Sequence, residues 1–214
     1  MAKSITLIGS TGLIGMQFLQ NTSEGDYQHV TAITRREIPG LSEKPFIKQS
    51  IHDFTDSESM RPDLKADVLV CTLGTTIKTA GSQQRFFEID RDIPLNLAKI
   101  AYEEGCRTFI LVSSIGADAN SSVFYSRVKG QLEEALKGIG FSTLHILRPS
   151  MLLGNRQESR RGEFIGKLLM QPLSILIPWQ YKPIQAGTVA AKIHQLIRDE
   201  TEGVKIWSGK PLFL

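Results

Sequence analysis

Three residues of the sequence have the types and the spacing needed to deliver a proton to a reacting oxygen. Tyr125 and Lys129 form a Tyr-x-x-x-Lys pair at the start of a predicted helix, so their side chains share one helical face. Ser114 lies at the end of a predicted strand, eleven positions before the tyrosine. A nearby ammonium lowers the pKa of a phenol, ordinarily ~10, by at most about three units. We therefore expect Ser114, Tyr125 and Lys129 to be catalytic.

The chemistry that this trio favours is the reduction of a carbonyl group. Hydride transfer to the carbonyl carbon leaves an alkoxide that needs a proton, and Tyr125 would supply it as a general acid. Ser114 would polarise and orient the carbonyl oxygen. Taken alone, the Tyr-x-x-x-Lys pattern also fits the start of an ordinary amphipathic helix, so the interpretation depends on the rest of the chain.

A glycine-rich stretch follows the first predicted strand and opens the first predicted helix. Gly9 would allow a tight turn, Gly12 the close approach of a pyrophosphate, and Gly15 the close packing of helix and sheet. The free amides of a helix N-terminus attract a phosphate group. A purely structural glycine turn is the alternative. The pattern predicts dinucleotide binding. The residues expected to hold the pyrophosphate are Gly9, Ser10, Thr11, Gly12, Leu13, Ile14 and Gly15. We expect Lys129, from the Tyr-x-x-x-Lys pair, to hold the nicotinamide ribose of the same cofactor.

The end of the second predicted strand indicates which dinucleotide is preferred. NAD enzymes of this kind usually place an acidic residue there, whereas this strand ends in Arg35 and Arg36. Two guanidinium groups suit the 2′-phosphate of NADP, although NAD stays possible and the pair could be a solvated surface feature. Asp53, after the third strand, would hold the adenine amino group or cap the following helix.

These motifs together resemble the short-chain dehydrogenase/reductase superfamily. The phrases 109–118 and 125–133 are similar to those of its atypical and extended branch, which includes oxidoreductases of the Tat-interacting-protein type. The resemblance implies that Leu73, Gly74 and Thr75 lie along the cofactor, and it makes a homodimer through two long helices possible. Asp90 stands where extended members often have asparagine.

The elements that must position these residues alternate between strands and helices. Such alternation predicts an α/β fold with a doubly wound parallel sheet of the Rossmann type. We expect a single domain over 1–214, in which 150–214 adds a small cap on the substrate side. The predicted strands are 4–8, 29–34, 46–49, 67–72, 108–113, 142–147 and 205–208, and the predicted helices 13–20, 90–104, 124–136, 162–170 and 186–199.

Composition excludes several other classes of protein. The net charge is +3 without a long basic run, which argues against a nucleic-acid partner. No apolar stretch reaches the ~18 residues of a membrane span. The four histidines lie at scattered positions without the spacing of a metal site. Cys71 and Cys106 are expected to be free thiols, Cys71 in the core, and they suggest a cytoplasmic location.

The C-terminal third is harder to interpret. Arg156, Arg160 and Arg161 could contact an anionic substrate or form a solvated basic loop. Trp179 and Tyr181, in the loop 172–183, could line a substrate pocket or mark a subunit contact.

Three functions remain open on the sequence. The leading hypothesis is an NADP-dependent oxidoreductase that reduces a small carbonyl compound. The second is a catalytically weak NADP-binding sensor or regulator, as some atypical family members are. The third is an enzyme like the nucleotide-sugar epimerases, although the chain is short for a large sugar-nucleotide pocket.

Overall fold

A computed structural model describes residues 2–154, 178, 181–199 and 201–213 of the chain. Its centre is a seven-stranded sheet in the order β3-β2-β1-β4-β5-β6-β9, and every neighbouring pair is parallel. The predicted doubly wound Rossmann sheet is therefore confirmed. The strands are β1 (Ser4–Ile8), β2 (His29–Thr34), β3 (Ile47–Ile51), β4 (Val68–Cys71), β5 (Thr108–Val112), β6 (Thr143–Arg148) and β9 (Gly203–Ser208).

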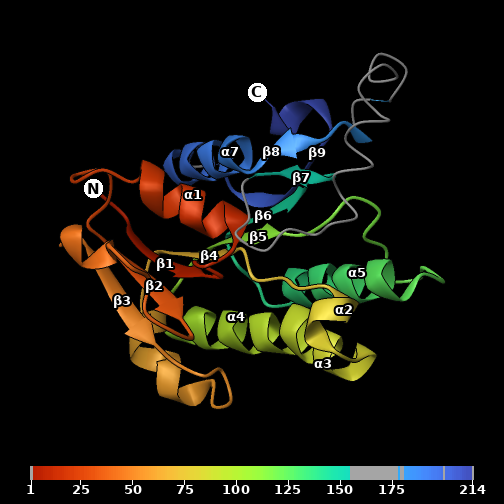
Figure 1. The fold of residues 1–214 in the computed structure, drawn as a ribbon, viewed down its shortest axis with the longest axis horizontal. Helices are drawn as coiled ribbons and strands as arrows, with labels where there is room; N and C mark the ends of the chain where they lie inside the picture. Colours follow the sequence, from red (N-terminus) through yellow and green to blue (C-terminus); the bar gives the residue numbers. More distant parts are fainter. Residues whose placement is uncertain (1, 155–177, 179–180, 200, 214) are drawn as a thin grey trace.

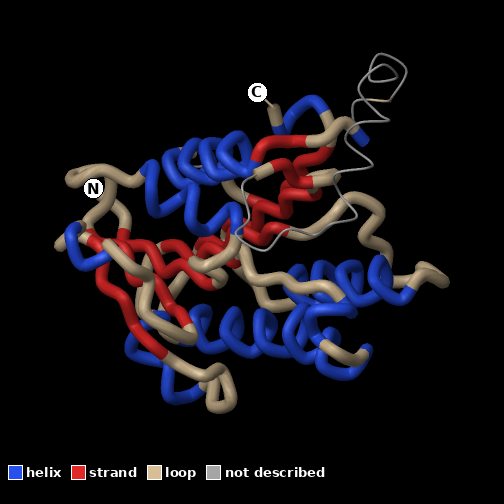
Figure 2. The backbone as a smooth tube through the Cα atoms, viewed as in Figure 1, coloured by secondary structure: helices blue, strands red, loops and turns tan. Residues whose placement is uncertain are grey.

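Helices cover both faces of the sheet, as Figure 1 shows, and Figure 2 shows the strands as the middle layer. One face carries α1 (Leu13–Asn21) and α7 (Ala186–Arg198), and the other carries α4 (Ile93–Glu103) and α5 (Phe124–Lys137). The short helices α2 (Ile77–Ala80) and α3 (Gln83–Phe87) lie beside α4 and α5.

Two hydrophobic cores result, one on each face of the sheet. Alternate residues of β1 point to opposite sides, so Leu7 joins the core under α1 and α7, whereas Ile8 joins the core over α4 and α5. Phe18 and Leu97 are fully buried in these two cores. Burial on both faces explains why the inner strands read as almost continuous apolar runs.

The region between β4 and β5 differs most from the prediction. The helix expected over 90–104 begins as an α-helix at Ile93, with Pro94 in its first turn. A π-helical turn, Glu88–Asp92, precedes it and joins it to α3. The π turn places Asp90 at the interior side of the element, where it is fully buried.

The C-terminal segment is built into the main fold. The expected short strand is β9, which pairs with β6 at the edge of the sheet, and Trp207 Nε1 donates to His145 Nδ1 at 3.2 Å. Helix α7 packs on α1, where the His194 ring stacks on Phe18 at 4.1 Å between centroids. A two-stranded ribbon of β7 (Leu152–Leu153) and β8 (Ile184–Gln185) was not predicted.

Two predictions from the C-terminal third fall outside the described residues. They are the helix over 162–170 and most of the loop 172–183. Of the helices that the structure does describe, none has the length and apolarity needed to cross a membrane.

Candidate functional site

The glycine loop is so closely packed that side chains are excluded at two positions. Gly9 has a φ of +85°, and a Cβ there would lie 2.5 Å from the backbone nitrogen of Leu73. A Cβ on Gly15 would lie 2.4 Å from the carbonyl oxygen of Gly9. Both distances are shorter than any real carbon contact, so the loop between β1 and α1 depends on glycine here.

The start of α1 leaves backbone amides available. Gly12 is the N-cap residue, its own amide donates to the Gly9 carbonyl at 2.9 Å, and among the described residues no side chain caps the helix. The first turn carries no acidic residue. A helix N-terminus in this state attracts an anion, so the loop fits a pyrophosphate.

Within this loop the side chains of the predicted residues differ in position. Ser10 is buried and its hydroxyl donates to the Leu7 carbonyl at 3.2 Å. Ile14 belongs to the core under α1, whereas Thr11 is exposed. Ser10 and Ile14 therefore have only their backbone to offer a ligand.

Arg35 and Arg36 are exposed and follow β2 directly. The Gln49 side chain fixes this turn by donating to the Thr34 hydroxyl at 2.7 Å and to the Arg36 carbonyl at 2.9 Å. Across the described ranges, neither guanidinium group has an ion-pair partner. Their positive charge is therefore available to an anion from solution.

Asp53 is exposed and shapes a turn rather than a helix. Its Oδ1 accepts from the amide of Thr55 at 2.9 Å and from its hydroxyl at 2.7 Å, and these hydrogen bonds lower the pKa of the Asp53 carboxyl. The 3₁₀-helix Glu58–Leu64 begins after Ser57, and Asp56 accepts from the Glu58 amide at 2.9 Å, so Asp53 does not cap this helix.

A buried ion pair lies at the carboxyl edge of the sheet. Lys129 Nζ on α5 is 2.7 Å from Asp90 Oδ1, and the two side chains are 4% and 0% exposed. Asp90 Oδ2 accepts from the Thr75 amide at 2.9 Å. A Cβ on Gly74 would lie 3.4 Å from both charged atoms of the pair. Asp90 thus links the turn 73–75, which is predicted to lie along the cofactor, to the predicted catalytic lysine.

Tyr125 lies one turn before Lys129 on α5 and is half-buried. Its ring packs against Phe86 at 5.5 Å between centroids. Lys129 follows Tyr125 by four positions, so the two side chains leave the same side of the helix. The tyrosine and lysine of the predicted trio are therefore brought together.

Ser114 comes two residues after β5 and is also half-buried. Its hydroxyl donates to the Ile115 carbonyl at 3.2 Å. The backbone beyond β5 stays aligned with the end of β6, because the Ser113 amide donates to Leu147 and the Ile115 amide to Pro149. Ser114 is thus held at the strand end, where this fold places its ligands.

Sequence reasoning missed a second buried carboxylate on α5. Glu133 is fully buried and accepts from the Ser113 hydroxyl at 2.5 Å. The Arg148 guanidinium donates to both of its oxygens, at distances from 2.5 to 3.1 Å. These hydrogen bonds raise the pKa of Arg148. The signal was available: Glu133 follows Lys129 by four positions, on the same face as the core residues of α5.

Gly130 was missed as well. The loop after β5 crosses α5 so closely that a Cβ on Gly130 would lie 2.2 Å from the backbone of Asp118 and Ala119. The Asp118 amide donates to the Ser126 carbonyl at 3.1 Å. The loop that follows Ser114 is therefore seated directly on the helix that carries Tyr125.

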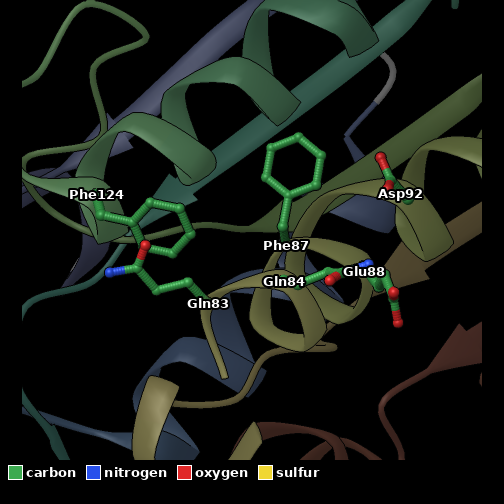
Figure 3. A pocket seen from close by; sticks show the side chains of 6 residues that line it. All are labelled: Gln83, Gln84, Phe87, Glu88, Asp92 and Phe124. Atoms are coloured by element: carbon green, nitrogen blue, oxygen red, sulfur yellow. The ribbon is translucent and has the colours of Figure 1, made fainter. Parts of the chain in front are cut away.

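A pocket of about 440 Å³ adjoins this region without including any predicted site residue (Figure 3). It lies where α3 and the π turn face the start of α5. Figure 3 shows the aromatic rings of Phe87 and Phe124 within it. Its lining residues are Gln83, Gln84, Phe87, Glu88, Asp92 and Phe124.

The remaining candidates lie in the C-terminal third. Arg156, Arg160, Arg161 and Trp179 fall outside the described residues. Tyr181 is 52% exposed.

Comparison with known sequences decides the family. A family model named HIM1 matches residues 43–177. The chain is 34% identical over 208 residues to the protein FMP52 of Eremothecium gossypii, covering 94% of this chain and 91% of that protein. It is 36% identical over 169 residues to HTATIP2 of Rattus norvegicus, covering 77% and 69%. The chain belongs to the HIM1 family. Membership confirms the predicted resemblance to the atypical NAD(P)-binding branch of the short-chain dehydrogenases and reductases.

Solved structures with the same fold have low sequence identity to this chain. The Bordetella bronchiseptica enzyme WbmG in complex with NAD superposes with a TM-score of 0.72 at 14% identity, covering 97% of this chain and 73% of that one. A UDP-N-acetylglucosamine 4-epimerase from Methanobrevibacter ruminantium superposes with a TM-score of 0.74 at 17% identity, covering 97% and 76%. The HIM1-family chain therefore has the same Rossmann-like fold as these proteins.

The expected cytoplasmic location is wrong. The FMP52 relatives from Eremothecium gossypii and Saccharomyces cerevisiae are named mitochondrial proteins. The expectation rested on Cys71 and Cys106, which are free and buried. Burial raises the pKa of each thiol to about 11, which keeps it protonated and inert in any compartment. These cysteines therefore carry no information on location.

Proposed function

We propose that this HIM1-family protein is an NADP-dependent oxidoreductase that reduces a small carbonyl compound. The observation that carries the proposal is the position of the Lys129 ammonium. It is buried against the turn 73–75 and lies one helical turn after Tyr125, at the end of the sheet where the glycine loop opens. A phenol beside a buried cation, close to a dinucleotide loop, is suited to proton transfer.

The proposed mechanism assigns one task to each residue. Bound NADPH supplies the hydride. Ser114 orients the carbonyl oxygen, and Tyr125 donates its proton to the alkoxide that forms there. Lys129 stabilises the phenolate left on Tyr125, and it would reach the nicotinamide ribose only at the turn 73–75, which covers it. Leu73, Gly74 and Thr75 lie along the cofactor, and the segment from 150 onward contributes to the substrate side of the same domain.

One feature of the chain, the arginine pair after β2, supports a cofactor with a 2′-phosphate. The exposed guanidinium groups of Arg35 and Arg36 follow β2, where the adenosine ribose lies in this fold. A hydrogen bond to a charged group contributes about 1.5–3 kcal/mol, which is roughly a 10- to 150-fold preference for NADP. Asp53, exposed after β3, is proposed to meet the adenine.

The test combines cofactor titration with a substitution. NADPH and NADH are titrated into the protein, and consumption of NADPH is then followed with a panel of aldehydes and ketones. We expect Tyr125→Phe to lose at least about a hundredfold in turnover, because a general acid contributes roughly that much, while NADPH affinity stays within a few-fold. Tyr102→Phe is the matched control, since Tyr102 lies on α4 against Phe141.

Two results would overturn the proposal in different ways. If Tyr125→Phe kept the wild-type rate, the catalytic assignment would be wrong. If NADPH bound tightly and no carbonyl compound were reduced, the protein would be an NADP-binding sensor.

A further inference from the structure

The ion pair between Asp90 and Lys129 is unusually well shielded from water. The side chains are 0% and 4% exposed, and the turn 73–75 covers them, with Gly74 itself facing solvent. The carboxylate uses one oxygen for Lys129 and the other for the Thr75 amide. It therefore joins three parts of the fold: the π turn before α4, the turn after β4, and α5.

Burial acts strongly on both charges. Burial lowers the pKa of Lys129, but the Asp90 carboxylate and the Tyr125 phenol raise it, and the net shift is upward. Burial raises the pKa of Asp90, and the Lys129 ammonium opposes that rise. Within the described part of the chain, the Cys71 thiol on β4 also acts on the charge of Lys129.

A lysine without a counter-ion behaves differently at such a position. Full burial of an unpaired ammonium lowers its pKa by up to about 3–5 units, because the charged form loses its hydration. Lys129 alone would then shed its proton near neutral pH. A neutral amine would neither stabilise a phenolate on Tyr125 nor attract the electrons of a ribose hydroxyl.

We propose that Asp90 is the positioning residue that keeps Lys129 a buried ammonium and fixes it beneath the turn 73–75. Asp90 touches neither substrate nor cofactor and acts through Lys129. The catalytic consequence rests on the function proposed above, whereas the charge state of Lys129 does not. Asp90 is thus added to the proposed site as the counter-ion on which the charge of Lys129 depends.

The experiment measures the titration of Lys129 in the full chain. Lysine side chains carrying ¹³C at Cε are followed by NMR against pH, and the Lys129 signal is assigned with Lys129→Arg. We expect Asp90→Asn to lower the Lys129 midpoint by about two units or more, below the ordinary ~10.4. Asp92→Asn is the matched control, because Asp92 lies on the same π turn, is 39% exposed and pairs with Arg91. The control should leave the midpoint where it is.

Stability against pH gives a second readout that needs no catalysis. In Asp90→Asn the folded-state pKa of Lys129 lies below its unfolded value, so the unfolded state binds more protons and stability rises with pH. The loss in the free energy of unfolding of Asp90→Asn relative to wild type should therefore shrink between the lowered midpoint of Lys129 and about pH 10. A purely structural role for Asp90 would give a deficit that is constant across this range.

A double substitution covers the case in which Asp90→Asn does not fold. Asp90→Asn combined with Lys129→Met leaves no unpaired charge in the interior, so at pH 7 it should be more stable than Asp90→Asn alone. The inference is overturned if the Lys129 midpoint in Asp90→Asn matches the control, or if the double variant is no more stable than the single one. If the midpoint falls but no carbonyl compound is reduced by wild type, the proposed function fails while this inference holds.

Discussion

Two carboxylates are fully buried beside α5, and they differ in the cation that each one meets. Glu133 accepts three hydrogen bonds from Arg148, whose side chain is 25% exposed, and a fourth from the Ser113 hydroxyl. Asp90 meets Lys129, which is almost wholly buried. A guanidinium stays protonated at every pH that a protein survives, whereas a buried ammonium responds to its surroundings.

The difference separates a structural ion pair from one suited to chemistry. The Glu133 cluster ties the ends of β5 and β6 to α5. The Asp90 pair lies one helical turn nearer to Tyr125 and contains the group that can gain or lose a proton. A buried ion pair is therefore informative about function only when its cation, its exposure and its neighbours are considered together.

The largest expected effect comes from breaking the structural pair. Glu133→Gln removes the buried charge that Arg148 and Ser113 need, and should destabilise the protein by about 3–5 kcal/mol in urea denaturation. The deficit should be equal at pH 6 and pH 9, because Arg148 stays charged throughout. Glu134→Gln, an exposed neighbour paired with Lys137, should cost less than about 1 kcal/mol. A deficit that shrank as pH rose would erase the distinction between the two pairs.

A smaller loss of stability is expected at Gly130, which directly follows Lys129 on α5. Gly130→Ala would force a Cβ into the backbone of Asp118 and Ala119, and overpacking of this kind costs about 1–3 kcal/mol. Gly138→Ala is the control, because the nearest atom to its Cβ would be 3.5 Å away and its φ is −80°. Thermal denaturation of both variants checks this. If the two alanine variants melted together, the loop after β5 would not depend on contact with α5.

The smallest effect extends the comparison to cations without a partner. Arg35→Ala should weaken NADPH binding by roughly tenfold, the low end for a charged hydrogen bond because the site is exposed, and leave NADH binding unchanged. Folding stability should not change, since Arg35 has no ion pair within the described residues. Fluorescence titration with both cofactors measures this. An equal loss of affinity for NADPH and NADH would show that Arg35 does not bind the 2′-phosphate.

Local patterns were sufficient for most of the sheet. The ranges of β1 and β2 were predicted to the residue, because an apolar run bounded by turn residues marks a buried parallel strand. The pattern did not predict the helix Gln83–Phe87, because its polar residues leave no clear apolar period. Its start also depends on the Ser82 hydroxyl, which accepts from the Arg85 amide. The pairing of β9 with β6 was also missed, because no local pattern encodes a neighbour so distant in sequence.

The candidate site was predicted in its residue types but not in its contacts. The spacing of Tyr125 and Lys129 placed them on one face of α5, as the structure has them. The partnership of Lys129 with Asp90 joins an α-helix to a π turn, and a π turn shifts the helical phase by one residue. Helical spacing alone puts Asp90 on the same face as Leu97, but it does not show that Lys129 is the partner of Asp90 there.

Because all seven strands run in the same direction, their carboxyl ends lie on one side of the sheet and their amino ends on the opposite side. The two sides differ in how freely their residues can change. Every loop that leaves a strand opens on one edge, and the glycine loop, Arg35 and Ser114 all lie there. The opposite edge is closed by contacts such as the Ser4 amide and hydroxyl donating to Asp67 Oδ2, both at 2.7 Å. Descendants of this chain are thus free to acquire new ligands by altering one rim while the other preserves the scaffold.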